Sequence, residues 1–394
     1  MLKFDDLGAT IDSVWRKANY DEDLFPDLAT SALIDSGLLR SVTREDIENW
    51  FLSGARIPRQ KMRAFGQPPL NLFLSHNFKI EALYWFNSTT DIHQHSFSGA
   101  FGVLAGSSVH SKYVFEFRNR IFSRMALGDL AFVSSELLAP GDVRAIVAGQ
   151  QFIHSLFHLE HPSISIVVRT LNEQDRTPQF SYLKPGIAID PAYHPDPQIT
   201  RLHLLEALAK TGAEPFFKGA QSALRSSDFW MAFKVLSVCP EPFRRLEEWQ
   251  EMVREARRHH GPRVDQLLAS LRETSRMQTI MRARQAVRDR DQRFFMALLL
   301  NVPNRRTIYE LVSRQFPGDD PATLVLRWID ELSEIMPGGM SLAPTSYDNL
   351  AGLLRSEAAS QQTEPACSAP LDSAVARPPF EILSDSSVLQ PLFR

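Results

Sequence analysis

The sequence predicts an α+β protein in which an antiparallel β-barrel is flanked by an N-terminal helical segment and a C-terminal all-α domain. From about residue 70 to 185, short β-branched and aromatic runs alternate with turn residues. This pattern is typical of many short antiparallel strands in a sandwich or barrel. Before and after this region, apolar residues recur at the spacing of amphipathic helices. A length of 394 residues suggests two or three domains.

The N-terminal helical segment is predicted over residues 1–65. Thr43 and Asp46 resemble a capping box, and the apolar stripe of the following helix begins at Ile47. The β-barrel is predicted over 66–190. Turn residues of the Gly, Pro, Asn and Asp type separate its strand-like runs and break this stretch into short connected strands.

The C-terminal helical domain is predicted over residues 199–355. Its clearest helix has Asp320 as N-cap and Pro321 at the first helical position, and an apolar face follows. The remaining tail, 356–394, is rich in Ser, Ala, Gln and Pro, a composition typical of disorder. Its apolar end, Val388–Phe393, is expected to dock on this chain or on a partner.

The composition is that of a globular protein in a reducing compartment. The chain is 44% hydrophobic and 23% charged, and a net charge of −3 gives no reason to expect a polyanionic partner. Its two cysteines, Cys239 and Cys367, lie far apart, which excludes a disulfide framework. Asp5 and Asp6 stand where a signal peptide would carry basic residues, and no apolar run is long enough for a membrane span. We therefore expect a cytoplasmic protein.

A His-x-His motif carries the chemistry. Residues at i and i+2 of a strand point to the same face, so His93 and His95 would project to one side. Two imidazoles placed in this way can take adjacent positions on one metal ion, and imidazole suits iron, copper, zinc or nickel.

Further histidines follow on later strands. His154 comes 59 residues after His95, behind the turn Pro140–Asp142, and it would converge on the first two only if the intervening strands fold back as a barrel. His158 follows four positions later. It is a candidate ligand or a partner of the ligands, but a packed core histidine is the preferred interpretation. His110 is expected at the surface or beside the ligands.

Together these motifs resemble the cupin superfamily, and within it the cysteine dioxygenase group. The resemblance covers about residues 80–170. The first motif has a Trp before a loop, a His-x-His, a run of small residues and a Phe, which are here Trp85, His93, His95, Ser98–Ala100 and Phe101. The second motif has a Pro-Gly-Asp turn and a late His, which are here Pro140–Asp142 and His154. The resemblance implies a three-histidine barrel that binds a metal ion and oxidises a thiol.

The carboxylate ligand common among cupins is missing. It would follow His95 by four or five residues, where Gly99 and Ala100 stand. The resemblance therefore implies three neutral ligands, His93, His95 and His154, as in the thiol dioxygenases. A facial ligand set leaves positions open for substrate and O₂, which favours mononuclear Fe(II) over a closed structural zinc site. Three histidines also suit copper, nickel or zinc.

The last strand departs from the family pattern. Cysteine dioxygenases carry Ser-x-His-x-Tyr there, whereas this chain keeps only Ser165 and has Val167 and Arg169 in place of the polar pair. Residues behind the ligands tune the site, so the change argues against cysteine itself as substrate. If the side chain of Arg169 points into the barrel, it favours a substrate with an anionic group. Arg63 is a second candidate for binding a carboxylate. The more common role of an arginine at such a position is an ion pair with an acid at the sheet edge.

Three functions are open at this point. The first is an Fe(II)-dependent oxygenase that acts on a small thiol, amino acid or other small acid or amine. The second is a cupin sensor that holds a metal or ligand and binds a protein partner through its C-terminal helices or tail. The third places the function in the helical domain.

Residues 251–293 hold eleven arginines and six acids, but their spacing favours a solvated helix with internal ion pairs over nucleic-acid binding.

Overall fold

The computed structural model describes residues 2–60, 65–86, 89–171, 178–335, 351–352 and 388–394. Two compact units are present, one formed by residues 1–134 and 138–274 and the other by 135–137 and 275–394. Within the described residues, no helix is both long enough and apolar enough to cross a membrane.

The predicted α+β class with an antiparallel barrel is confirmed. Strands β2 to β9 form two sheets in the orders β2-β9-β4-β7 and β6-β5-β8-β3, which is the double-sheet jelly roll found in cupins. Strand β1 extends the first sheet, and the β10–β11 pair links β6 to β3 and closes the second sheet into a barrel. The strands are β1 (Pro69–Leu74), β2 (Phe78–Trp85), β3 (His93–His95), β4 (Gly99–Ala105), β5 (Ser108–Phe122), β6 (Met125–Leu138), β7 (Val143–Ile146), β8 (Gly149–His158), β9 (Ser163–Thr170), β10 (Ser181–Leu183) and β11 (Ile187–Ile189).

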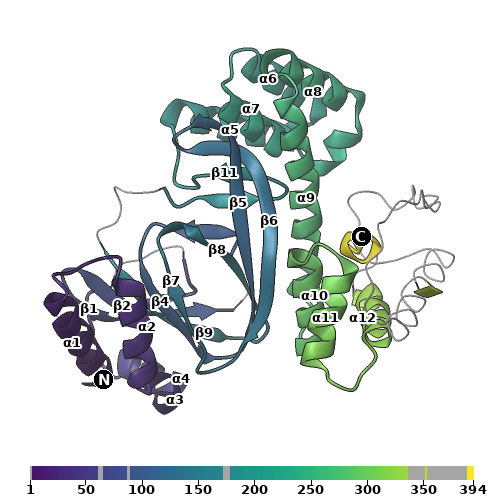
Figure 1. The fold of residues 1–394 in the computed structure, drawn as a ribbon. Helices are drawn as coiled ribbons and strands as arrows, with labels where there is room; N and C mark the ends of the chain where they lie inside the picture. The colour runs from purple at the N-terminus through teal and green to yellow at the C-terminus, as the bar shows by residue number, and fades with distance from the viewer. Residues whose placement is uncertain (1, 61–64, 87–88, 172–177, 336–350, 353–387) are drawn as a thin grey trace, which may run out of the picture. The chain divides into compact units, whose positions relative to one another are not determined.

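Four N-terminal helices cover the outer face of the first sheet, as Figure 1 shows in purple. They are α1 (Leu2–Lys17), α2 (Phe25–Asp35), α3 (Leu38–Ser41) and α4 (Arg44–Leu52). Apolar residues that alternate along β2 and β9, such as Ile80 and Ile166, pack beneath these helices, so the opposite side of both strands faces the barrel interior. The predicted capping box is confirmed, because Thr43 and Asp46 bond reciprocally at the start of α4.

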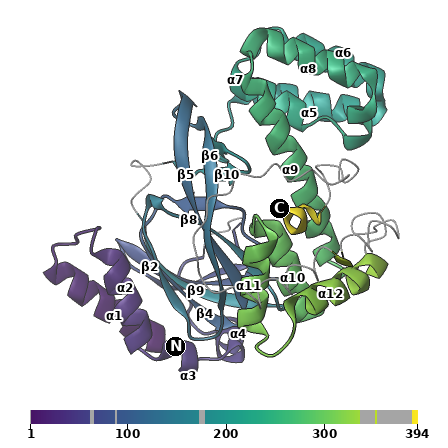
Figure 2. The ribbon, with the colours of Figure 1, turned by 45° about the vertical axis from the view of Figure 1, so that its right-hand side comes forward.

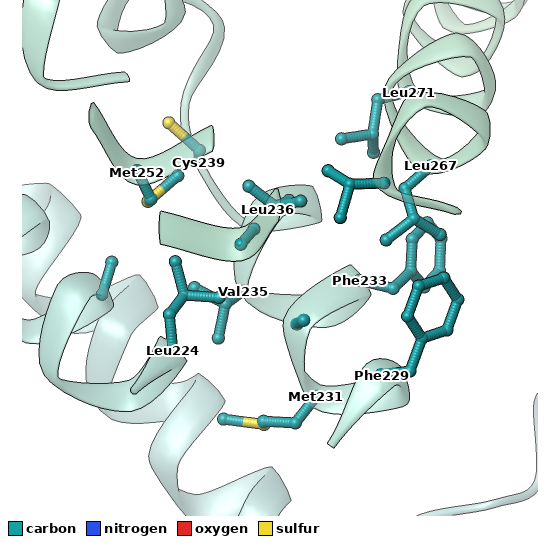
Figure 3. Close-up of a cluster of buried hydrophobic side chains, with 14 of the residues drawn as sticks. Leu224, Phe229, Met231, Phe233, Val235, Leu236, Cys239, Met252, Leu267 and Leu271 are labelled. Carbon is teal, nitrogen blue, oxygen red and sulfur yellow. The ribbon is translucent and has the colours of Figure 1, made fainter. Parts of the chain in front are cut away.

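The first unit also contains a helical subdomain built from α5 (Asp196–Thr211), α6 (Ala213–Leu224), α7 (Phe229–Ser237), α8 (Glu247–His260) and the first part of α9 (Arg263–Arg284). Its apolar core is centred on α7, nearly all of whose residues are buried (Figure 3). Met125 and Ile189 from the barrel strands join this core. The Gln266 amide also donates to the backbone oxygens of Gly128 and Gly186, which fixes α9 to β6 and to the turn before β11.

The second unit contains α10 (Arg290–Asn301), α11 (Arg305–Gln315), α12 (Pro321–Ile335) and a short 3₁₀ helix, η2 (Gln390–Phe393), which lies beside α11 (Figure 2). Asp320 caps α12 as predicted and accepts from the Thr323 amide at 2.8 Å. The tail predicted over 356–394 ends in the apolar segment Val388–Phe393, which was expected to dock on this chain or on a partner, and this segment packs in the second unit. Leu389 and Leu392 are fully buried, and the Arg305 guanidinium donates to the Leu392 carbonyl at 2.9 Å.

Candidate metal centre

Two neighbouring strands bring three histidines together inside the barrel. His93 and His95 lie on β3, and His154 lies on β8 directly opposite His93. Residues that face each other on paired strands project to the same side of the sheet, and a shift of register between His93 and His95 brings Gly149 opposite His95. All three imidazoles are at most 5% exposed, and their ligand atoms lie within 4.8 Å of one another.

Two of the nitrogen atoms have the spacing of neighbouring ligands on a single metal ion. The Nε2 atoms of His95 and His154 are 2.9 Å apart, and two nitrogens bound at right angles to one metal at about 2.0–2.1 Å would be separated by about that distance. His93 uses its Nδ1 to donate to the Asp91 carbonyl at 2.7 Å. That leaves its buried Nε2 as the ligand atom, with no hydrogen-bond partner in the described part of the chain.

A direct hydrogen bond between His95 and His154 would also fit 2.9 Å. It would leave the Nε2 of His93 buried without a partner, which is costly. One divalent cation satisfies all three Nε2 atoms at once, so the donor set fits a metal ion better than it fits a hydrogen-bonded trio. The Nδ1 of His95 has no partner among the described residues in either case.

Burial keeps these imidazoles in the form that binds metal. It lowers the pKa of His95 and His154 well below the ordinary value of 6.5, and neighbouring imidazoles lower it further. Burial also lowers the pKa of His93, although the bond to Asp91 opposes the shift. A neutral imidazole keeps a lone pair for a metal, whereas an imidazolium does not. The trio is therefore ready to bind a cation at neutral pH.

The structure explains why no carboxylate follows the His-x-His motif. A Cβ atom added at Gly99 would lie 1.9 Å from the backbone oxygen of Val168, because β4 and β9 approach each other closely there. Ala100 points the other way, into the core beneath the N-terminal helices. Neither position can therefore present an acid to the three histidines.

The histidines open into a small cavity of about 160 Å³. Drug-sized ligands occupy pockets of roughly 300–1,000 Å³, so this cavity suits a much smaller molecule. Its walls are mostly aromatic and aliphatic. They are formed by Phe65, Glu81, Leu83, Trp85, Thr90, Phe97, Phe101, Ile146, Leu156, Ser165, Val167, Arg169 and Gln179 together with the three histidines.

One wall of the cavity carries buried charges. Arg169 pairs with Glu81 at 3.2 Å, and its guanidinium lies 4.4 Å from the centre of the Phe97 ring. Glu81 also accepts from Lys79, which stands directly opposite Arg169 on the paired strands. Of these three residues, only Arg169 was predicted from the sequence as a site residue; Glu81 and Lys79 were not. A signal for these two residues was present in the sequence, because two charged residues stand two positions apart in the otherwise apolar run that forms β2.

The other candidate site residues predicted from the sequence lie at different distances from the three histidines. Ser165 lines the cavity, two residues before Val167. His158 lies outside the three-histidine cluster, stacks on Trp85 at 4.9 Å and bonds Ser108 through Nδ1. His110 is fully buried and contacts His154. Arg63 lies outside the described residues.

Several solved structures are similar to parts of this chain. The DMSP lyase DddQ from Ruegeria pomeroyi DSS-3 is 14% identical over 45% of this chain and 94% of its own, with a TM-score of 0.24. A cupin-superfamily protein from Desulfitobacterium hafniense DCB-2 is 14% identical over 30% of this chain and 100% of its own, with a TM-score of 0.19. A structure from a study of the DMSP lyases RdDddP and RnDddQII is 15% identical over 38% of this chain and 74% of its own, with a TM-score of 0.23.

No protein-family model matches the sequence, and no curated protein matches it. All three TM-scores lie below 0.5. The assignment of a metal centre therefore rests on the geometry of the histidines and on the strand order of the barrel.

Proposed function

We propose that this protein is a mononuclear metal-dependent oxygenase that binds Fe(II) through His93, His95 and His154. The observation that carries the proposal is the convergence of three buried, neutral imidazoles at the spacing of ligands on one ion. Three protein ligands would leave room at the ion for further ligands, and Fe(II) held by these histidines would supply a Lewis acid at which O₂ and substrate could meet. A structural zinc site would instead use four protein ligands.

The substrate proposed is a small organic acid, with a thiol or an amine as its reacting group. The cavity volume of about 160 Å³ limits its size, and Arg169 on the cavity wall provides a cation for a carboxylate. Glu81 would hold the guanidinium in place from the side. The aromatic side chains of Trp85 and Phe97 make this part of the cavity wall apolar.

Elemental analysis and oxygen consumption together test this proposal. Protein purified without oxygen should contain about one equivalent of metal, and the His154→Ala variant should contain almost none. The Fe(II)-loaded protein should consume O₂ with at least one member of a panel of small thiols, amino acids and hydroxy acids. The His158→Phe variant is the matched control, because His158 is equally buried but lies outside the cluster.

Two results would count against the proposal in different ways. If the wild type bound no stoichiometric metal, the metal centre itself would be wrong. If it bound metal but consumed no O₂ with any member of the panel, a metal- or ligand-holding sensor would be favoured over an oxygenase.

A further inference from the structure

A fourth buried histidine stands directly behind the candidate metal ligands. His110 lies on β5 opposite Leu156, two residues beyond His154 on β8. Its Nε2 is 3.0 Å from the Nδ1 of His154, and the two rings meet edge to face at 84°. Phe101 packs edge-on against His110. His110 has no exposed surface, so its position is fixed by packing.

The two ring nitrogens of His154 have different partners. Nε2 points to the Nε2 of His95 in the candidate metal centre, whereas Nδ1 points to His110. A neutral imidazole carries one proton, and the nitrogen that binds a metal cannot be the one that carries it. If Nε2 binds the metal, Nδ1 must hold the proton and donate it to His110. The Nε2 of His110 must then be the unprotonated acceptor.

We infer that His110 is a positioning residue that fixes the proton of His154 on Nδ1 and thereby presents its Nε2 to the metal ion. This inference rests on the proposed metal centre. Groups that accept a hydrogen bond from a metal-bound histidine set its tautomer and ring orientation. His93 has such an acceptor in the Asp91 carbonyl, and His110 does the same for His154 with an uncharged ring in place of a carbonyl or carboxylate.

Packing alone would require much less of His110. A residue that only fills space among Phe101, Phe152 and His154 need not place a nitrogen 3.0 Å from the Nδ1 of His154. An apolar side chain of similar volume would serve that purpose without bringing two polar nitrogens into the core. The two roles therefore differ in what they predict for a change from His to Leu and from His to Gln.

Cobalt binding to the full-length protein distinguishes the two roles. We expect His110→Leu to weaken Co²⁺ binding by about 10- to 100-fold and to shift the visible ligand-field bands of the bound ion. His110→Gln keeps a side-chain oxygen that can accept from the Nδ1 of His154, so it should recover part of the affinity. His158→Leu removes another buried histidine of the same barrel and should leave both the affinity and the bands unchanged.

The inference would be overturned if His110→Leu bound Co²⁺ as tightly as the wild type with the same spectrum, or if the Leu and Gln variants were equally weakened. If neither variant folds, the tautomer of His154 can be measured directly in the wild-type protein. Nitrogen-15 NMR of the Zn²⁺-loaded protein should show His154 bound through Nε2 and protonated on Nδ1, and binding through Nδ1 would overturn the inference. A wild type that binds neither ion would instead reject the proposed function.

Discussion

The Nε2 atoms of His95 and His154 lie 2.9 Å apart, although 59 residues separate them in the sequence. The pairing of β3 with β8 brings these two ring nitrogens together in a buried site. Such an arrangement is costly unless a cation or a shared proton lies between them. The stability of the protein should therefore depend on the ion that it binds.

Metal binding should stabilise the fold. A ligand that binds only the folded state adds about 2.7 kcal/mol at 100 times its Kd. Thermal unfolding of chelator-treated protein should therefore occur at a lower Tm than unfolding with excess Zn²⁺ or Fe²⁺. The His95→Gln variant should show no such difference between the two conditions. A Tm of the wild type that did not respond to metal would contradict the prediction.

Metal-free protein should lose stability as the pH falls below about 6.5. Burial lowers the pKa of His93, His95 and His154 in the folded state, so the unfolded chain takes up protons that the folded chain does not. The three histidines contribute fully to the free energy of unfolding above the ordinary histidine pKa. This contribution is lost as the pH drops towards their folded-state pKa values. Each such proton lowers the free energy of unfolding by about 1.4 kcal/mol per pH unit.

Urea unfolding of chelator-treated protein between about pH 5 and 8 measures this dependence. His154→Gln removes one of the three groups and should reduce the slope of unfolding free energy against pH. An unchanged slope would show that His154 is not held neutral by burial.

Glu81 should contribute strongly to stability, because this buried carboxylate is shared by the buried Lys79 and the partly buried Arg169. Lys79 and Arg169 face each other directly, and both pair with Glu81. Removing one member of a buried ion pair typically costs about 3–5 kcal/mol, so Glu81→Gln should lower the urea midpoint sharply. The exposed pair Arg118–Asp129 is the matched control, and Asp129→Asn should leave the midpoint nearly unchanged. Equal effects of the two substitutions would contradict this account.

Arg169 should act mainly on substrate binding. Arg169→Lys keeps the charge but loses the planar guanidinium that lies over Phe97. Once a substrate is found, we expect this variant to raise KM more than it lowers kcat, with the same metal content as the wild type. A change in kcat alone would place Arg169 outside the binding of the substrate's anionic group.

The clustering of the three histidines could be anticipated from the sequence in two different ways. Alternation along a strand predicted that His93 and His95 share a face, whereas His154 was indicated only by the resemblance to cupins, with their Pro-Gly-Asp turn and late histidine. The charged wall and His110 could not be predicted in the same way. The contact of His110 with His154 depends on the register between β5 and β8, and the role of Glu81 depends on which residues face it across β9.

The close approach of the β4 and β9 backbones at Gly99 could not be predicted from the sequence. The sequence reveals that an acid is missing there, but only the closeness of the Val168 oxygen shows that no side chain fits. Gly99→Ala should therefore destabilise the protein, because the β4–β9 backbones must move apart. Gly352→Ala is the control, since nothing lies within 4 Å of a Cβ atom there. A lower urea midpoint for the first variant alone is the expected result, and an unchanged midpoint for both would contradict the close approach.

The packing of the chain's last residues gives a final prediction. Leu392 is fully buried, and its carbonyl accepts from the Arg305 guanidinium, so this segment belongs to the core of the second unit. Truncation of a buried leucine to alanine costs about 2–5 kcal/mol, whereas the same change in a disordered tail would cost nothing. Leu392→Ala should lower the urea midpoint of the transition that reports on Trp328, and Gln390→Ala, at a half-buried position of the same 3₁₀ helix, should change it much less. Equal midpoints for Leu392→Ala and the wild type would show that this segment does not contribute to the core of the second unit.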